Sequence, residues 1–447
     1  MQTSSSGRRW PSLVALAVSV ACASNVVLAA SGDLDTTFGT AGKLIIDFAT
    51  GGHNYAQAKA IARDGSGNVY LVGDAQPSGF FNLAIVKVNA NGQLVTSFGT
   101  NGKLLIDFSA SHGDYQHGEG AALDSSGNLY VAGDSRTNDV FGVAVTKIDP
   151  TGHLVTAFGT GGKAFAAIGY YGQNVAVDGS GQVYVIGGGS STGSQDFVIA
   201  KFDTSGQLVA NFGAGGTATV DFDGRSDLAY DIVFDTQGNL LLAGMSKDLP
   251  TGHVDMAVAK LDPNGHLITS FGTAGKTLIV VEDVGFATAL ARDALGNLFL
   301  AGFSRFIGGS THLAAAKLDA NGHLLAGFGS AGIKVFQSTV DFDFDFPGSS
   351  AVVDGNGGVY LGGGDTDFNV VQIDGGGNLV PEFGSGGLKR IDFAGKDEAV
   401  SAMVSDGNNR LYVAGAAEDT VAGYVMEATK LIATRPDPIF SNGFDGS

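Results

Sequence analysis

Cysteine, proline and charge are all scarce in this chain. Cys22 is the only cysteine among 447 residues, proline occurs 9 times, and charged residues make up 15%. Because Cys22 lies in an apolar N-terminal run, a chain cut after that run has no thiol, which excludes disulfides and cysteine metal ligands. Lysine and arginine total 25 against 44 aspartates and glutamates, and the net charge of −19 argues against nucleic acid as a partner.

The N-terminus has the layout of an export signal. An Arg-Arg pair precedes the mostly apolar run 13–28, and two alanines follow it. This pattern predicts a signal peptide over residues 1–30 and a secreted protein, extracellular or periplasmic, without a transmembrane span in the mature chain. Lipidation at Cys22 is disfavoured, because Ser19 stands where lipoprotein signals usually carry leucine.

Glycine, by contrast, is abundant, with 70 residues that follow a repeat. A Phe-Gly pair followed by a glycine-containing turn recurs every 54 to 60 residues. Self-similarity at a near-fixed period indicates one supersecondary unit stacked on copies of itself. The phenylalanines of the seven copies are Phe38, Phe98, Phe158, Phe212, Phe271, Phe328 and Phe383.

Each unit contains four short strand patterns separated by Gly, Asn and Asp turns. In the first full unit they cover 58–63, 69–72, 83–88 and 103–108, with Gly73 expected to end the second. Such spacing predicts a four-stranded antiparallel meander. One meander cannot bury both of its faces, whereas several packed around an axis can. The sequence therefore predicts an all-β fold, a seven-bladed β-propeller over residues 31–433.

The strand count also predicts how the ring closes. The last unit, which begins near Ala399, lacks a fourth strand of its own, whereas 43–48 is a fourth-strand pattern that stands alone at the N-terminus. We therefore expect 43–48 to complete the last blade. This closure removes an open sheet edge that would invite association, and a monomer is expected.

Two stretches of the unit, LVTSFGTNGK at 94–103 and DGSGNVYLVG at 64–73, resemble the delta-60 repeat of bacterial secreted and surface proteins. The resemblance extends from residue 34 to about 432. More loosely, GNLYVAG at 127–133 is similar to the core of NHL-type propeller blades. That similarity implies that the first strand of each unit lies nearest the axis. The delta-60 resemblance implies a fold and no established activity.

The chain ends in a segment unlike the repeat. Residues 439–445 resemble a short tail found on exported proteins of Gram-negative bacteria, so 434–447 is set apart as a C-terminal tail.

Candidate ligand-binding residues lie in the connections that vary between units. Such variation indicates either a binding face, because variable loops on a rigid scaffold are where ligands usually bind, or the drift of unconstrained loops. The strongest pattern is the alternation of Asp341, Asp343 and Asp345 with phenylalanines. It suits a hard cation such as Ca²⁺ if the carboxylates converge, or a solvated strand edge if they do not. No other cofactor is predicted. The remaining candidates are Asp223, Asp227 and Glu282.

Two other acidic patterns and one histidine pattern are weaker. Aspartate ends the fourth strand in only four units, at Asp47, Asp107, Asp221 and Asp392, which favours turn capping over a ring of ligands. His112 and His117 are five residues apart and miss the spacing of a helical metal pair. A glycosidase-like carboxylate pair stays open, with Asp134, Asp227 and Glu282 as candidates.

Motifs of known enzyme classes are missing from the sequence: it has no nucleophile elbow in a strand-to-helix context, no zinc-protease motif and no P-loop. The sequence therefore favours a non-catalytic propeller that binds a protein, a polysaccharide or a cation on its variable face, the face formed by the connections that differ between units. The alternative is a secreted propeller hydrolase or lyase with a metal in the axial channel.

Overall fold

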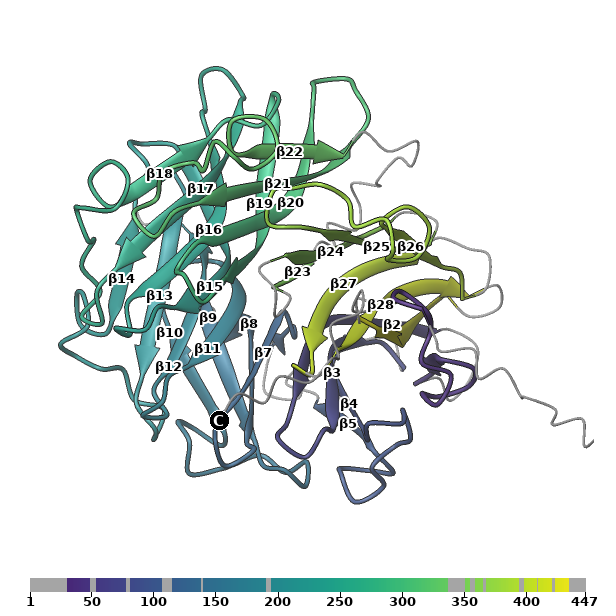
Figure 1. Cartoon of the computed structure of the whole chain (residues 1–447). Coiled ribbons are helices and arrows are strands. Elements are labelled where there is room, and N and C mark those ends of the chain that lie inside the picture. Colours follow the sequence, from purple (N-terminus) through teal and green to yellow (C-terminus); the bar gives the residue numbers. More distant parts are fainter. Residues whose placement is uncertain are drawn as a thin grey trace, which may run out of the picture.

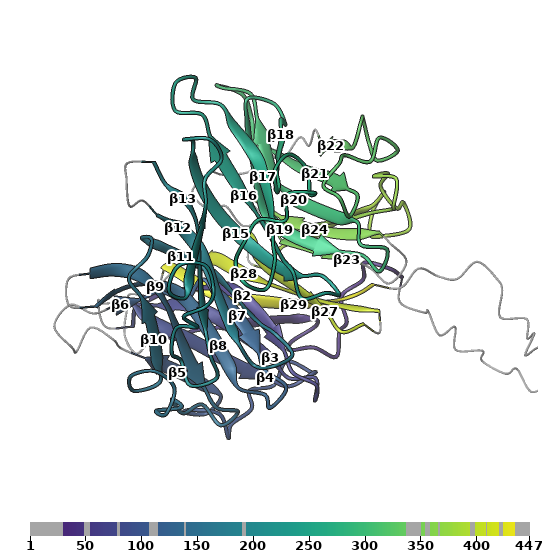
Figure 2. The ribbon, with the colours of Figure 1, turned by 90° about the vertical axis from the view of Figure 1, so that its left-hand side faces the viewer.

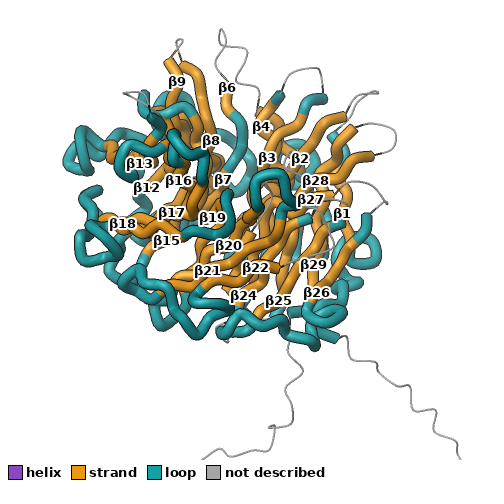
Figure 3. The backbone as a smooth tube through the Cα atoms, turned by 90° about the horizontal axis from the view of Figure 1, so that it is seen from above, coloured by secondary structure: helices purple, strands orange, loops and turns teal. Residues whose placement is uncertain are grey.

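The computed structural model consists of short β-strands joined by loops, and the part of the chain that it describes contains no helix (Figures 1 and 3). The described residues are 30–48, 54–77, 81–106, 115–137, 140–189, 194–336, 350–353, 358–364, 367–393, 398–407, 409–419 and 423–433. Over these ranges no helical segment has the length and apolar character needed to cross a membrane. The predicted signal peptide and C-terminal tail lie outside the described residues, apart from Ala30.

The strands form four-stranded antiparallel meanders, as the repeat predicts. The first is β2 (Asn54–Arg63), β3 (Val69–Ala75), β4 (Asn82–Val88) and β5 (Lys103–Ile106). The second is β7 (Gly120–Leu123), β8 (Leu129–Thr137), β9 (Val140–Ile148) and β10 (Lys163–Ala166), with β6 (Tyr115–Gln116) also on β8. The third is β11 (Tyr171–Val177), β12 (Val183–Gly189), β13 (Asp196–Phe202) and β14 (Thr217–Val220).

The pattern continues through the C-terminal half, where neighbouring meanders stand side by side (Figures 1 and 2). The fourth is β15 (Ser226–Phe234), β16 (Leu240–Lys247), β17 (Val254–Leu261) and β18 (Lys276–Ile279). The next is β19 (Val284–Arg292), β20 (Leu298–Arg305), β21 (His312–Leu318) and β22 (Ile333–Phe336). Then come β23 (Ser350–Val353), β24 (Val359–Gly363), β25 (Phe368–Ile373) and β26 (Leu388–Ile391). The final strands are β27 (Glu398–Ser405), β28 (Arg410–Asp419) and β29 (Gly423–Ile432).

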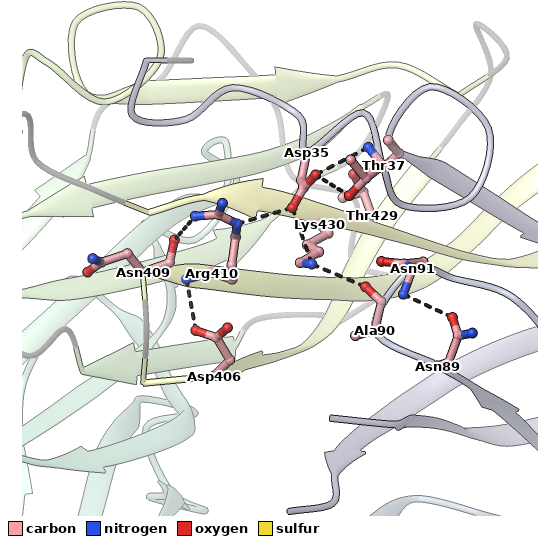
Figure 4. Close-up of polar contacts among 11 residues, drawn as sticks. Asp35, Thr37, Asn89, Ala90, Asn91, Asp406, Asn409, Arg410, Thr429 and Lys430 are labelled. Atoms are coloured by element: carbon pink, nitrogen blue, oxygen red, sulfur yellow. Dashed lines mark hydrogen bonds and ion pairs between the residues drawn. The ribbon is translucent and has the colours of Figure 1, made fainter. Parts of the chain in front are cut away.

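The N-terminal strand β1 (Lys43–Ile46) is the fourth member of this last meander. It pairs antiparallel with β29, from Lys43 opposite Thr429 to Ile46 opposite Met426. Asp35, which precedes β1, accepts hydrogen bonds from Lys430 on β29 and Arg410 on β28 (Figure 4). The two ends of the described chain therefore belong to one sheet.

An aspartate organises the first hairpin of each of the first five meanders. Oδ1 of Asp64 accepts hydrogen bonds from the N–H groups of Ser66 and Asn68, at 3.0 and 2.8 Å. Gly67 takes the left-handed conformation, with a φ of 86°, that closes the turn. The same two contacts recur at Asp124, Asp178, Asp235 and Asp293.

The phenylalanine of the Phe-Gly pair is a core residue. Phe98 is fully buried and lies edge-on to Tyr70 of β3, with ring centroids 5.7 Å apart. Nζ of Lys87 lies 4.7 Å from the Tyr70 centroid, over its negative face. All seven repeat phenylalanines are buried: Phe38, Phe98, Phe158, Phe212, Phe271, Phe328 and Phe383.

The glycine of the same pair joins neighbouring meanders. The Gly99 N–H donates to the carbonyl of Thr151, in the third hairpin turn of the following meander, at 2.9 Å. Equivalent bonds run from Gly39 to Asn91, Gly159 to Ser205, Gly213 to Asn264, Gly272 to Asn321, Gly329 to Gly376 and Gly384 to Ser31. In each Phe-Gly pair, therefore, the phenylalanine packs in the core and the glycine bonds to the next unit.

The expectation that Gly73 ends the second strand is wrong. Gly73 lies inside β3, opposite a bulge at Lys59 in β2. A Cβ at Gly73 would lie 2.0 Å from the carbonyl oxygen of Gln57, closer than any side chain can approach. The glycine is therefore required by the close approach of the bulged backbone.

Candidate functional site: a central cavity and two acidic clusters

A cavity of about 640 Å³ is lined by residues of β2, β7, β11, β15, β19, β23 and β27, the first strands of the meanders. In five of these strands the extra residue of a β-bulge faces the cavity. A bulge re-aims the side chain of its extra residue, so the repeat delivers one side chain per bulged strand to the same space. These residues are Lys59, Gln173, Tyr230, Thr288 and Ser401.

Three aromatic rings lie together on one wall of the cavity. Phe286 and Phe303 are stacked, with centroids 4.6 Å apart and planes inclined by 22°. Tyr230 lies next to Phe286, with centroids 6.3 Å apart. The amide side chains of Gln173 and Asn174 line the same cavity, so flat apolar faces and hydrogen-bonding groups border one volume.

Asp231 connects three neighbouring first strands. Its Oδ1 accepts hydrogen bonds from Nδ2 of Asn174 and the N–H of Ile232, and its Oδ2 accepts one from the N–H of Leu290, all at 2.7 to 2.8 Å. Burial raises the pKa of Asp231 to about 6. Because both oxygens are engaged with protein donors, the carboxylate ties β11, β15 and β19 together.

A charged cluster borders the cavity where the first and second meanders meet. Nζ of Lys59 lies 2.7 Å from Asp74 and 2.5 Å from Glu119. Burial disfavours the charge on Lys59, but the two carboxylates outweigh it and raise the pKa of that ammonium. Burial likewise raises the pKa of Glu119. The cluster gives this side of the cavity a fixed ion pair.

The sequence singled out His117 without its partner. Nδ1 of His117 lies 3.0 Å from Oδ2 of Asp74, and this hydrogen bond raises the pKa of the imidazole. The same contact, working against burial, lowers the pKa of Asp74. His117 is therefore an ion-pair partner, whereas His112, with which the sequence grouped it, lies outside the described residues.

The candidate ligand residues fall in three different settings. Asp341, Asp343 and Asp345 lie outside the described residues. Asp223 is exposed and pairs with Lys276, at 3.0 Å. Glu282 precedes β19, and its Oε1 lies 3.4 Å from Nδ1 of His312. Asp227 is fully buried at the start of β15. The structure pairs Asp223 with Lys276, places Glu282 beside His312, and gathers neither carboxylate with Asp227 into one acidic group.

Asp227 belongs to one of two acidic clusters in the described part of the chain. One carboxylate oxygen from each of Asp196, Asp221 and Asp227 lies within 4.8 Å of the others. A second group with the same geometry consists of Asp367, Asp392 and Glu398. Both lie where the third and fourth strands of one meander meet the first strand of the next.

Sequence reasoning treated Asp221 and Asp392 as turn caps and missed their partners. The turn-cap role holds for Asp221, whose Oδ1 accepts the N–H of Gly224 at 2.6 Å. The missed signal is the dipeptide Asp-Phe, which occurs at the start of the third strand and again after the fourth strand in the same two units. Aligning the units by strand register would have found it.

Comparisons with known proteins concern the fold. No family model and no curated protein matches the chain, so the delta-60 resemblance stays a prediction. Among solved structures, the chain is similar to polysaccharide lyase Uly1, with 11% identity, a TM-score of 0.49, and 84% of this chain and 90% of that chain covered. It is also similar to the β-propeller domain of the Trilobed protease from Pyrococcus furiosus, with 11% identity, a TM-score of 0.44, and coverage of 89% and 100%. Extracellular domains 1–2 of Drosophila Semaphorin 1b match at 10% identity and a TM-score of 0.43, with coverage of 85% and 87%.

Proposed function

We propose that this chain is an exported, closed seven-bladed β-propeller that binds a polysaccharide in its central cavity without catalysing a reaction on it. The closed ring is supported by the repeating bond from each Phe-Gly pair to the next meander. The last of these bonds runs from Gly384 to Ser31, in the segment that leads into β1. The pairing of β1 with β29 supports the same arrangement.

The composition of the cavity carries the choice of ligand. Sugars present apolar ring faces edged by hydroxyl groups, and they are bound by aromatic faces beside hydrogen-bonding side chains. The wall formed by Tyr230, Phe286 and Phe303 offers the aromatic faces. The hydrogen-bonding side chains are those of Gln173 and Asn174. A protein partner would call for a broad apolar patch, whereas this surface is concave and mixed.

The carboxylates in the cavity lining favour binding over hydrolysis. A glycosidase needs one carboxyl to donate a proton and another to act as a base or nucleophile. Both oxygens of Asp231 are held by protein donors, and Glu119 is paired with Lys59. Asp231 is therefore unavailable to a substrate unless these hydrogen bonds break, and Glu119 alone does not supply the two carboxyl groups that a glycosidase needs.

The test is a binding assay with defined glycans. The mature protein is run through native gels that contain neutral or acidic polysaccharides, and ligands that retard it are followed with oligosaccharide fragments by calorimetry. Phe286→Ala removes the central ring of the wall, and losing a stacking contact of about 1 kcal/mol weakens binding at least about fivefold. Phe306→Ala is the matched control, since Phe306 is 55% exposed and does not line the cavity.

Two results would contradict the proposal. One is the absence of retardation across the panel while the protein melts cooperatively. The other is equal binding by wild type and Phe286→Ala. Product release from any retarding polysaccharide would favour the hydrolase or lyase alternative.

A further inference from the structure

The acidic cluster of Asp196, Asp221 and Asp227 lies at the junction between the third and fourth meanders, outside the lining of the central cavity. Asp196 begins β13, Asp221 follows β14, and Asp227 is the second residue of β15. The three side chains therefore come from three separate strands that tertiary packing brings together. Their oxygens lie within 4.8 Å of one another.

A buried oxygen of Asp227 points to a ligand independently of the clustering. Asp227 has no exposed surface, its Oδ2 accepts the N–H of Phe222 at 2.8 Å, and the Ser246 hydroxyl also hydrogen-bonds to this carboxylate. Its Oδ1 is buried without a hydrogen-bond partner, as is Oδ1 of Asp196. Burying a carboxylate oxygen without a donor or cation is costly, so a cation bound at this position would be stabilising.

The neighbouring cations are engaged elsewhere. Nη2 of Arg225 lies 2.5 Å from Asp255, and Nζ of Lys276 bonds to the side chain of Asp223 and to the main-chain carbonyl of Asp221. Among the described residues, no lysine, arginine or histidine forms a salt bridge with the three carboxylates. The cluster therefore carries up to three negative charges, and no cationic side chain of the described residues lies at salt-bridge distance from them.

Within the described ranges, the arrangement recurs at one other junction. Asp367, Asp392 and Glu398 occupy the same register positions, and the Phe393 N–H donates to Glu398 as the Phe222 N–H donates to Asp227. The accompanying ring pairs, Phe197 with Phe222 and Phe368 with Phe393, also match. The junction between the fourth and fifth meanders has Asp255, Val280 and Gly285 at these positions and lacks the cluster.

We propose that each of these clusters binds one Ca²⁺ ion. Calcium takes six to eight oxygen ligands at about 2.3–2.6 Å, so oxygens on opposite sides of the ion lie about 4.6–5.2 Å apart. Three carboxylates within 4.8 Å fit that span and leave positions for water. The ion would neutralise the buried oxygen of Asp227 and clamp two meanders at their junction.

The experiment counts bound calcium on the purified protein. Calcium-free wild type is titrated with Ca²⁺ by calorimetry, and its melting temperature is followed in the same buffers. We expect two sites per chain, one for each cluster, with Kd values of about 10⁻⁴–10⁻³ M as in extracellular calcium modules. Binding raises the melting temperature by mass action.

Matched variants assign the ions to the clusters. Asp227→Asn and Glu398→Gln should each remove one site and leave the other, and Asp196→Asn repeats the first loss at a half-buried position. Asp223→Asn is the control. It removes one negative charge two residues from Asp221, but Asp223 is exposed and paired with Lys276 and is not a member of the cluster. It should keep both sites.

Several outcomes would overturn the proposal. These are no saturable calcium binding by folded wild type, an equal loss in Asp223→Asn and Asp227→Asn, or binding of Mg²⁺ in preference to Ca²⁺. Polysaccharide binding is measured separately, so failure of one proposal leaves the other standing.

Discussion

The side chain of Asp35 joins the N-terminal segment to two strands of the last meander, and Asp35→Asn measures the contribution of that contact. Its carboxylate is 9% exposed and lies 3.2 Å from Nζ of Lys430 and 3.1 Å from Nε of Arg410 (Figure 4). It also accepts the hydroxyl of Thr37 at 2.6 Å. Burial opposes the charge, but these contacts outweigh it and lower the pKa of Asp35 from 3.8 to about 2.

The magnitude follows from that shift. A pKa lowered by nearly two units corresponds to about 2.5 kcal/mol, of which solvent screening at this partly buried site leaves about 2 kcal/mol. This stability is present above the unfolded pKa and is lost as the pH falls through the folded value. For a folded region of about 400 residues the unfolding entropy is about 0.8 kcal/mol/K, so Asp35→Asn should lower the melting temperature by about 2–3 °C. Lys430, left buried without its carboxylate, would add to the loss.

The assay is urea unfolding followed by far-UV circular dichroism at neutral pH, repeated between pH 4 and 2. We expect a lower midpoint with an unchanged slope, and convergence of variant and wild type in acid. Asp33→Asn is the control, because Asp33 lies in the same segment and accepts the N–H of Ala30. A wild-type midpoint in Asp35→Asn, or a difference as large at pH 2 as at neutral pH, would refute the reasoning.

Two further predictions concern the bulge and the buried carboxylate. Gly73→Ala places a Cβ against the Gln57 carbonyl and should cost about 1–3 kcal/mol, whereas Gly65→Ala, with open space around it, should be neutral in the same denaturation assay. Burial and neighbouring carboxylates raise the pKa of Asp227 from 3.8 to about 6. In calcium-free buffer, the free energy of unfolding of wild type should therefore fall by about 3 kcal/mol relative to that of Asp227→Asn as the pH rises from 3.8 to 6. Parallel plots of unfolding free energy against pH for the two proteins would contradict this.

The sequence was sufficient to predict the meanders because their signals are local. The Asp64 turn depends on residues within four positions, and the spacing of Phe98 from its neighbours in the repeat is visible without any contact. The pairing of β1 with β29 was predictable by counting strands. The last unit has no fourth strand of its own, and the fourth-strand pattern at 43–48 stands alone at the N-terminus. Gly73 was misread because its constraint comes from the carbonyl of Gln57, across the sheet.

The candidate site depended on tertiary structure. Glu119 and Lys59 meet across two meanders, and Asp231 receives a donor from each of its neighbours. Contacts of this kind join residues about one repeat apart, and a single sequence does not say which strand faces which.

By itself, then, the sequence determined the period, the strands and their turns, because hydrophobic alternation and turn chemistry act over a few residues. Only the tertiary structure decided which side chains share a surface. It brought Asp196, Asp221 and Asp227 within 4.8 Å of one another from three strands, and it left an oxygen of Asp227 buried there. Burial and the distance between charges are properties of the packed chain, and they set the chemistry of the site.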